Sequence, residues 1–123
     1  MSATDSSEYR KLFTGVAFAC RDNPSWMSTP GFPLSEDNIS TLLVMSEDIA
    51  LKPSTKLLVN SEPYIFRRRH DYNGIVLQKG ASGLVTCLTL KHFLIGMHDE
   101  KTKAEIIITQ LARVQDYLTR HGV

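Results

Sequence analysis

The chain has 123 residues, 14 lysines and arginines, 13 aspartates and glutamates, and a formal net charge of +1 at pH 7. This length suits one domain that buries a core without disulfides or metal ions, so we expect a single domain over residues 1–123. A net charge near zero excludes a strong overall field that would attract nucleic acid, and recognition through charge therefore has to be local.

The cysteines and the N-terminus favour a cytoplasmic protein. Cys20 and Cys87 lie inside apolar runs, where a thiol behaves as a small hydrophobic group, and no CxxC motif is present. The first residues lack the basic and then apolar regions of a secretion signal, and no apolar run approaches the roughly 20 residues of a membrane helix. We therefore expect a cytoplasmic location.

A short helix and a pair of strands are predicted at the start of the chain. Ser6 or Ser7 can cap the helix, whose buried side is formed by residues at three-and-four spacing, Tyr9, Leu12 and Phe13. Residues 15–20, GVAFAC, are predicted as a strand. The turn sequence DNPS at residues 22–25 connects it to a returning strand at residues 26–29.

A second helix is predicted from Ser35 to about Ile49. Ser35 is a suitable N-cap, and Glu36 and Asp37 carry the negative charge that the positive start of a helix favours. Its buried stripe is expected to consist of Ile39, Leu42 and Leu43.

The second half of the chain changes to short apolar runs separated by turn sequences. These runs are residues 56–59, 64–69, 74–78, 84–90 and 93–97, and the turns contain NSEP, DYNG and GASG. Because a parallel connection needs about a dozen residues, such short connections favour antiparallel neighbours.

The last predicted element is a long helix. Residues 102–105, TKAE, match a capping box with Thr102 as the N-cap, and Gly122 can end the helix. Its apolar face contains Ala104, Ile107, Ile108, Leu111, Val114 and Leu118. The predicted fold class is therefore α+β, with a central antiparallel sheet of about six to seven strands and the N- and C-terminal helices packed on one face.

The order and spacing of these features resembles the profilin family of small actin-monomer-binding proteins. The matching landmarks follow one another at the spacing of plant profilins: Lys79–Gly83, Leu88–Thr89, Ile95–Gly96, Asp99–Glu100 and Asp116–Leu118. Upstream, Leu51–Pro53, Tyr64–Phe66, Asp22–Trp26 and Pro30–Phe32 match the earlier strands and the first hairpin. No single motif is specific, so the resemblance rests on the ordered spacing.

The resemblance implies a monomeric protein of the cytoplasm and cytoskeleton that binds monomeric actin and regulates filament assembly. By motif match, its actin-binding residues are Arg68, Lys79, Lys103, Thr109, Ala112 and Arg113. The resemblance also implies binding of proline-rich proteins such as formins, and of phosphoinositides. The residues matched to the proline-rich peptide groove, where a preformed polyproline helix docks on rigid rings, are Tyr9, Trp26, Tyr117 and Val123.

Two of these assignments have structural alternatives. Trp26 can simply be the largest side chain of the core, with Tyr117 packed on it. The basic run Arg67–His70 can be a solvated strand end that prevents edge pairing, or it can meet a partner or an anionic lipid. In a regular strand Arg67 and Arg69 point to one face and Arg68 to the other, so they would not address one partner together.

No catalytic motif is found, and we expect neither enzyme activity nor a cofactor. Cys87 near His92 or His98 could suggest a thiol nucleophile, but its place in an apolar run favours a structural cysteine. His92, His98 and Asp99 lack the usual spacing of metal ligands. The alternative functional class is a dimeric adaptor of the roadblock or longin type for small GTPases or motors, which has a similar size and similar layers.

Overall fold

The structure, a computed structural model, describes residues 12–23 and 25–123. In chain order its elements are β1 (Gly15–Cys20), β2 (Trp26–Ser28), α2 (Glu36–Glu47), β3 (Lys56–Val59), β4 (Glu62–His70), β5 (Gly74–Lys79), β6 (Ser82–Leu88), β7 (His92–His98) and α3 (Ala104–Arg120). The predicted N-terminal helix with Tyr9 lies largely outside the described residues. None of the helices in the described part is long and apolar enough to cross a membrane.

The strands form one seven-stranded sheet in the order β2-β1-β7-β6-β5-β4-β3. Every neighbouring pair is antiparallel, which confirms the prediction from the short connections. Tight hairpin turns need residues with positive φ, and Asn60 (51°) and Ser61 (68°) supply them between β3 and β4. Gly80, at 61°, does the same between β5 and β6.

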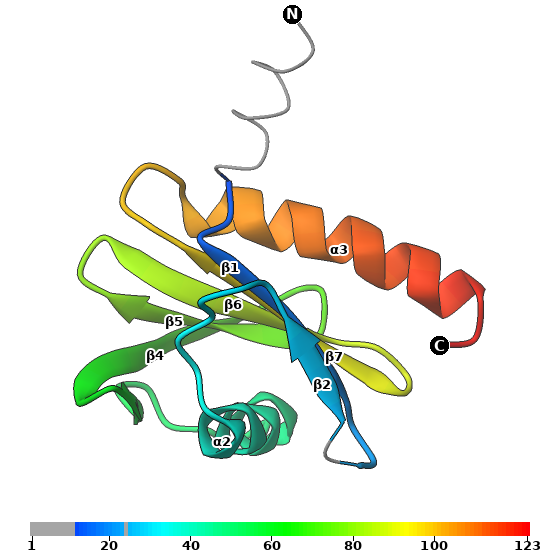
Figure 1. Cartoon of the computed structure of the whole chain (residues 1–123), viewed down its shortest axis with the longest axis horizontal. Coiled ribbons are helices and arrows are strands. Elements are labelled where there is room, and N and C mark those ends of the chain that lie inside the picture. Colours follow the sequence, from blue (N-terminus) through cyan, green and yellow to red (C-terminus); the bar gives the residue numbers. More distant parts are fainter. Residues whose placement is uncertain (1–11, 24) are drawn as a thin grey trace, which may run out of the picture.

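Two helices cover the sheet from opposite sides, with α2 on one face and α3 on the other (Figure 1). We call these sides the α2 face and the α3 face. The prediction that the C-terminal helix covers one face is confirmed, and the N-terminal half of that prediction lies outside the described residues. The middle helix, which the sequence did not assign to a face, covers the side that α3 leaves open.

Strand alternation divides the core into two clusters. On β7, Phe93, Ile95 and Met97 belong to the cluster under α2, whereas Leu94 belongs to the cluster under α3. The residues of α3 that face the sheet, Ile107, Ile108 and Leu111, are 0–6% exposed. Because both faces of the central strands are covered, β6 and β7 are buried continuously after their first residue instead of at alternate positions.

The starts of the two helices differ in how they are capped. Ser35 and Asn38 form a reciprocal capping box at α2, with both bonds at 3.1 Å. The capping box predicted for α3 is wrong: its N-cap is Lys103, which makes no side-chain cap bond. Thr102 is 6% exposed and its backbone closes a turn on Asp99, so its hydroxyl does not cap the helix. Val114, predicted to be buried, is 45% exposed.

Candidate functional site

A β-bulge in β4 determines where its three arginines point. The pairing with β5 passes from Phe66–Leu77 to Arg68–Val76, so Arg67 is an extra residue without a partner across the strand. Val76 faces α3, and therefore so does Arg68. Arg67 donates through Nε to Oε1 of Gln78 at 3.0 Å, on the same face. The expectation for a regular strand, with Arg67 and Arg68 on opposite faces, is wrong because of the bulge.

Arg69 points to the α2 face and belongs to the fold. Its guanidinium donates to the carbonyl oxygens of Ser46 at 2.9 Å and Met45 at 3.3 Å, and also to that of Asp48. These are carbonyls at the end of α2, where a cation is favourable. Those of Met45 and Asp48 also accept from the backbone N–H groups of Asp48 and Leu51, so the Ser46 carbonyl depends most on Arg69. Arg69 is therefore engaged in holding α2 to β4.

Arg67 and Arg68 line a hollow of about 400 Å³ between β4, β5 and the start of α3, which we call the β4–α3 hollow. Its other polar and charged lining residues are Gln78, His98, Glu100, Thr102, Lys103 and Glu105. Arg68 forms an ion pair with Glu105 at 2.6 Å. Since both side chains are well exposed, this pair is worth at most about 1 kcal/mol and can be exchanged for contacts with a partner.

Four of the other predicted actin-binding residues continue from this hollow along α3. Lys103 lies at its rim, and Thr109 is exposed one turn further on, where its hydroxyl donates to the Glu105 carbonyl at 3.0 Å. Ala112 is half-buried and Arg113 is exposed on the next turn. Together with Arg68 they form a strip of cations among small side chains, which we call the α3 strip.

Lys79 does not join this strip. Its ammonium group pairs with Glu62 and lies 5.7 Å from the centre of the Tyr64 ring, and Tyr64 belongs to the cluster on the α2 face. The hydrogen bond to Glu62 raises the pKa of Lys79. Because Gln78 points to the α3 face, its neighbour Lys79 has to point away from it. Lys79 therefore lies apart from the other five residues predicted to bind actin.

The residues predicted for a proline-rich peptide groove are separated by the sheet. Trp26 pairs with Ala19 across the β1–β2 hairpin, and Ala19 belongs to the α2-face cluster. Tyr117 is on α3, 61% exposed, with its ring 4.3 Å from that of His121. Trp26 and Tyr117 therefore do not line one groove, and the suggestion that Tyr117 packs on Trp26 is wrong as well. Tyr9 lies outside the described residues.

Val123, the fourth residue predicted for the groove, follows α3 and is six residues from Tyr117 in the sequence. It is half-buried, and its backbone N–H donates to the Leu118 carbonyl at 2.9 Å. On β2 it is Met27, paired with Phe18, that points to the α3 face. Strand parity thus puts Met27, and not Trp26, on the face that holds Tyr117.

His98 and Gln78 were not predicted as site residues, although both line the β4–α3 hollow. His98 is 7% exposed, and it shares the α3 face with Leu94 because the two are four residues apart on β7. That parity was readable from the sequence. The presence of Arg67 in the same hollow was not, because it depends on the bulge.

The cysteine and histidine arrangement does not support thiol or metal chemistry. Burial raises the pKa of Cys87 to about 12, so its thiol stays protonated at neutral pH and is a poor nucleophile. Among the residues that the structure describes, no group of three or more His, Cys, Asp or Glu side chains could hold a metal ion.

Comparison with known proteins gives the same family at the level of sequence and of fold. The family model for profilin matches residues 9–123. Profilin-2 of Acanthamoeba castellanii is 27% identical over 109 residues, which cover 89% of this chain and 86% of the relative. The crystal structure of A. castellanii profilin II superposes with a TM-score of 0.79 at 25% identity, covering 94% of this chain and 92% of the other.

Two further structures of similar fold contain ligands. LokiProfilin1 in complex with rabbit actin has a TM-score of 0.73 at 13% identity, over 96% of this chain and 91% of the other. Mouse profilin IIa in complex with a double repeat from the FH1 domain of mDia1 has a TM-score of 0.74 at 11% identity, over 99% and 97%. At these identities the likeness concerns the fold. The family match takes precedence over the roadblock or longin alternative: this chain belongs to the profilin family.

Proposed function

We propose that this chain binds monomeric actin through the α3 strip and so regulates actin filament assembly. Membership of the profilin family supports this function, as does the complex of a structurally similar profilin with rabbit actin. The observation that carries the assignment of the surface is the bulge in β4, because it turns Arg68 toward Lys103 at the start of α3. An acidic, partly apolar actin surface is complementary to cations set among small side chains.

The mechanism that follows from this proposal is occupancy. A profilin that covers one end of the actin monomer blocks addition at that end and leaves the other end free to join a filament. No bond is made or broken, so the protein acts by binding and not by catalysis. We further propose that residues 1–123 act as one domain and as a monomer, in the cytoplasm and at the cytoskeleton.

Charge reversal on the α3 strip tests the actin surface. Arg113→Glu and Lys103→Glu should each weaken actin binding by about tenfold in a fluorescence titration, because an attraction becomes a repulsion. Lys52→Glu is the matched control, since Lys52 is also exposed but lies between α2 and β3, next to Leu51, which packs on the α2-face cluster. Parent-like binding by both strip variants would overturn the assignment.

Lys79→Glu separates the geometry from the motif match. The side chain of Lys79 lies with Glu62 and Tyr64 on the α2 face, so this variant should bind actin as the parent does. A loss as large as that of Arg113→Glu would show that actin reaches around the end of β5.

Proline-rich binding is proposed at the end of α3, where the Tyr117 and His121 rings lie together. Rigid rings of this kind suit a polyproline helix, and a similar profilin is known with a formin FH1 repeat. Calorimetric titration with poly-L-proline should show binding that Tyr117→Ala abolishes. The fluorescence emission of Trp26 should stay unchanged during the titration, because this side chain is on the other face. Saturable binding of poly-L-proline by the parent and by Tyr117→Ala alike would place the site elsewhere.

Phosphoinositide binding is a second proposed property, and the bulge is the observation that favours it. It places Arg67, Arg68 and Lys103 around one hollow, where an anionic headgroup would meet three cations and the two carboxylates Glu100 and Glu105. Such binding should be weak and should disappear as salt is raised, since it depends on charge. Sedimentation with phosphoinositide vesicles at low and physiological salt measures it, and equal binding by Arg68→Glu would contradict it.

A further inference from the structure

A second hollow, of about 340 Å³, lies on the opposite side of the molecule between α2 and the β1–β2 hairpin, and we call it the α2 hollow. Its buried floor is formed by Ala19, Ile39 and Phe93, and its walls by Trp26, Leu43 and Val44. Trp26 is 36% exposed and Val44 66% exposed. An apolar floor under exposed Trp and Val side chains is the form of a binding hot spot.

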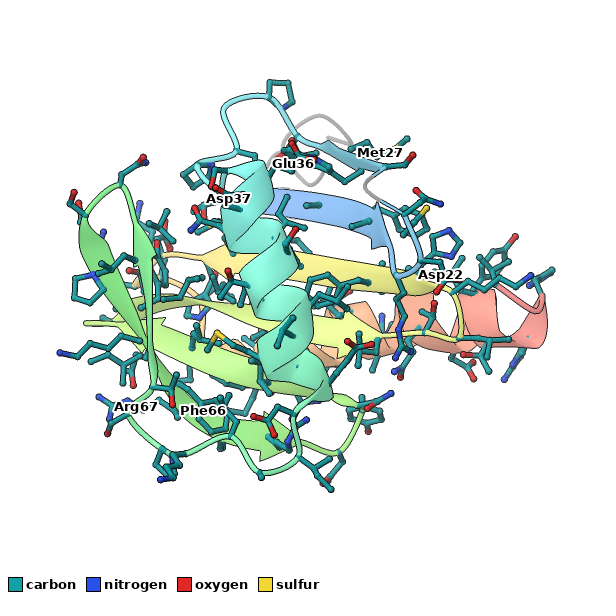
Figure 2. All side chains as sticks on the ribbon, turned by 90° about the horizontal axis from the view of Figure 1, so that it is seen from below. Asp22, Met27, Glu36, Asp37, Phe66 and Arg67 are labelled. Atoms are coloured by element: carbon teal, nitrogen blue, oxygen red, sulfur yellow. The ribbon has the colours of Figure 1, made fainter. Side chains whose placement is uncertain are left out.

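The charges around this hollow are acidic. Asp22 lies near the hairpin end and Glu36 at the start of α2, both lining the hollow, as Figure 2 shows from this side. Arg21 is the basic residue in its lining, and it is already engaged: its guanidinium donates to Glu47 at 2.7 Å and to the Thr89 carbonyl at 2.8 Å. The rim therefore offers carboxylates without a free cation among the described lining residues.

We propose that the α2 hollow binds a short basic segment of a partner protein in which one large apolar side chain is flanked by lysine or arginine. The apolar side chain fits a hollow at the lower end of the size range of ligand pockets. The flanking cations meet Asp22 and Glu36, and the Trp26 ring provides an aromatic face that attracts a cation. The occupant is specified by charge: an acidic or uncharged segment would leave the two carboxylates unpaired.

This site is independent of the proposed actin surface. The α2 hollow lies on the α2 face and the α3 strip on the α3 face, with the sheet between them. A ligand in the hollow would therefore leave the strip accessible. The protein would then be able to link actin to a second, basic partner.

The test is a titration of the ¹⁵N-labelled full chain with the peptide acetyl-Arg-Arg-Phe-Arg-Arg-amide, followed by NMR. We expect saturable shifts of Arg21, Ser40, Val44 and the Trp26 indole, and none of Thr109 or Arg113. The emission of Trp26, the only tryptophan in the sequence, should change with the same binding curve. The acidic counterpart acetyl-Glu-Glu-Phe-Glu-Glu-amide should not bind.

Glu36→Lys and Asp37→Lys form a matched pair of variants. Both residues are in the first turn of α2 and both changes alter the net charge equally, but only Glu36 lines the hollow (Figure 2). Glu36→Lys should weaken binding of the basic peptide by about five- to tenfold at low salt. Asp37→Lys should weaken this binding by less than about twofold. Val44→Ser should also weaken binding of the basic peptide. Ile49→Ser should not, because Ile49 is 90% exposed and lies outside the hollow.

Three results of the peptide titrations would overturn the proposal. These are equal binding of the acidic peptide, peptide shifts confined to the α3 face, and identical behaviour of Glu36→Lys and Asp37→Lys. A dimer in light scattering that Val44→Ser dissociates would also overturn it, because the hollow would then be covered by a second copy. Loss of actin binding by Arg113→Glu concerns the other face and leaves this proposal unaffected.

Discussion

The two helices are held to the same sheet by different kinds of contact. α3 is held mainly by apolar burial. Its polar links are the hydrogen bonds that the Gln115 amide donates to the Tyr72 and Leu88 carbonyls, and the ion pair between Arg68 and Glu105. α2 is tied by polar contacts at both ends: the Asn38 amide donates to the Leu58 carbonyl, and Arg69 to the carbonyls at its C-terminus.

A buried hydroxyl pair adds to the polar contacts of α2. Ser46 and Thr86 are 1% and 0% exposed and their oxygens are 2.8 Å apart. Thr86 also accepts from the Ile75 N–H at 3.0 Å. Such buried polar links specify one position for a helix, whereas apolar burial alone tolerates small shifts. α3 depends less on polar contacts, and its exposed side carries the α3 strip, where the exposed Arg68–Glu105 ion pair is its polar link to β4.

Removing the core contact of either helix should have the largest effect. Leu42 on α2 is 0% exposed and Leu111 on α3 is 3% exposed. We expect Leu42→Ala and Leu111→Ala each to lower the free energy of unfolding by about 2–5 kcal/mol, through lost burial and the cavity that remains. Urea denaturation measures this, with Ile49→Ala as the exposed control. An effect below about 1 kcal/mol would mean that the helix concerned is not packed as described.

Arg69→Met should have the next largest effect and should act on α2 alone. It removes a donor to three carbonyls, of which those of Met45 and Asp48 still accept from the backbone N–H groups of Asp48 and Leu51. The partly buried Ser46 carbonyl loses the one donor that it has among the described residues, which costs about 1–3 kcal/mol. Arg67→Met is the matched control, since the exposed Arg67 makes its one side-chain hydrogen bond within the described residues to Gln78. This change should alter stability by less than about 0.5 kcal/mol. Hydrogen exchange should show faster opening of the last turn of α2 in Arg69→Met only. Equal behaviour of the two variants would refute the distinction that the bulge creates.

A smaller, pH-dependent effect is expected from His70, the last residue of β4. Its Nε2–H donates to the Thr86 carbonyl at 2.7 Å, and its Nδ1 accepts from the Tyr72 N–H at 3.0 Å, so the ring is held neutral. Burial lowers the pKa of His70, and Arg68 and Arg69 act in the same direction, against the Thr86 bond and Asp71; the Cys87 sulfur, 3.9 Å away, is an uncharged neighbour.

The sign of the effect follows from that lowered pKa. The unfolded chain takes up the proton first as pH falls, so the stability from neutral His70 is complete above about pH 6.5 and declines progressively below it. Denaturation at pH 7.5, 6.5 and 5.5 should show this decline in the parent and a shallower one in His70→Gln. His121→Gln, at the exposed end of α3, should leave the slope unchanged. A parent-like slope in His70→Gln would assign the decline to other groups.

The parts of the fold that were predicted from sequence are those fixed by periodicity over many residues. The apolar spacing from Ile107 to Leu118 determines a helix and its buried face, and the short turns determine antiparallel pairing. The face of Trp26 was not predictable in this way, because a shift of one residue in a hairpin moves a side chain to the other side of the sheet. The bulge at Arg67 is equally hidden, since three successive arginines give no sign of which one is extra. Of the predicted actin-binding residues, those on α3 follow from its periodicity, Arg68 joins them because of the bulge, and strand parity places Lys79 apart.

The smallest effect concerns the start of α3, which has a lysine where a capping side chain would be favourable. Lys103 makes no cap bond, so Lys103→Ser should raise the free energy of unfolding by about 0.5–1 kcal/mol by satisfying a free N–H of the first turn. The same change removes a cation from the α3 strip and should weaken actin binding. Thermal denaturation and an actin titration on one variant therefore measure the two roles separately. Lys101→Ser, also exposed but before the cap, should leave stability unchanged. If Lys103→Ser gains stability and keeps its actin affinity, Lys103 does not contact actin. The contact surface would then lie further along α3, toward Thr109 and Arg113.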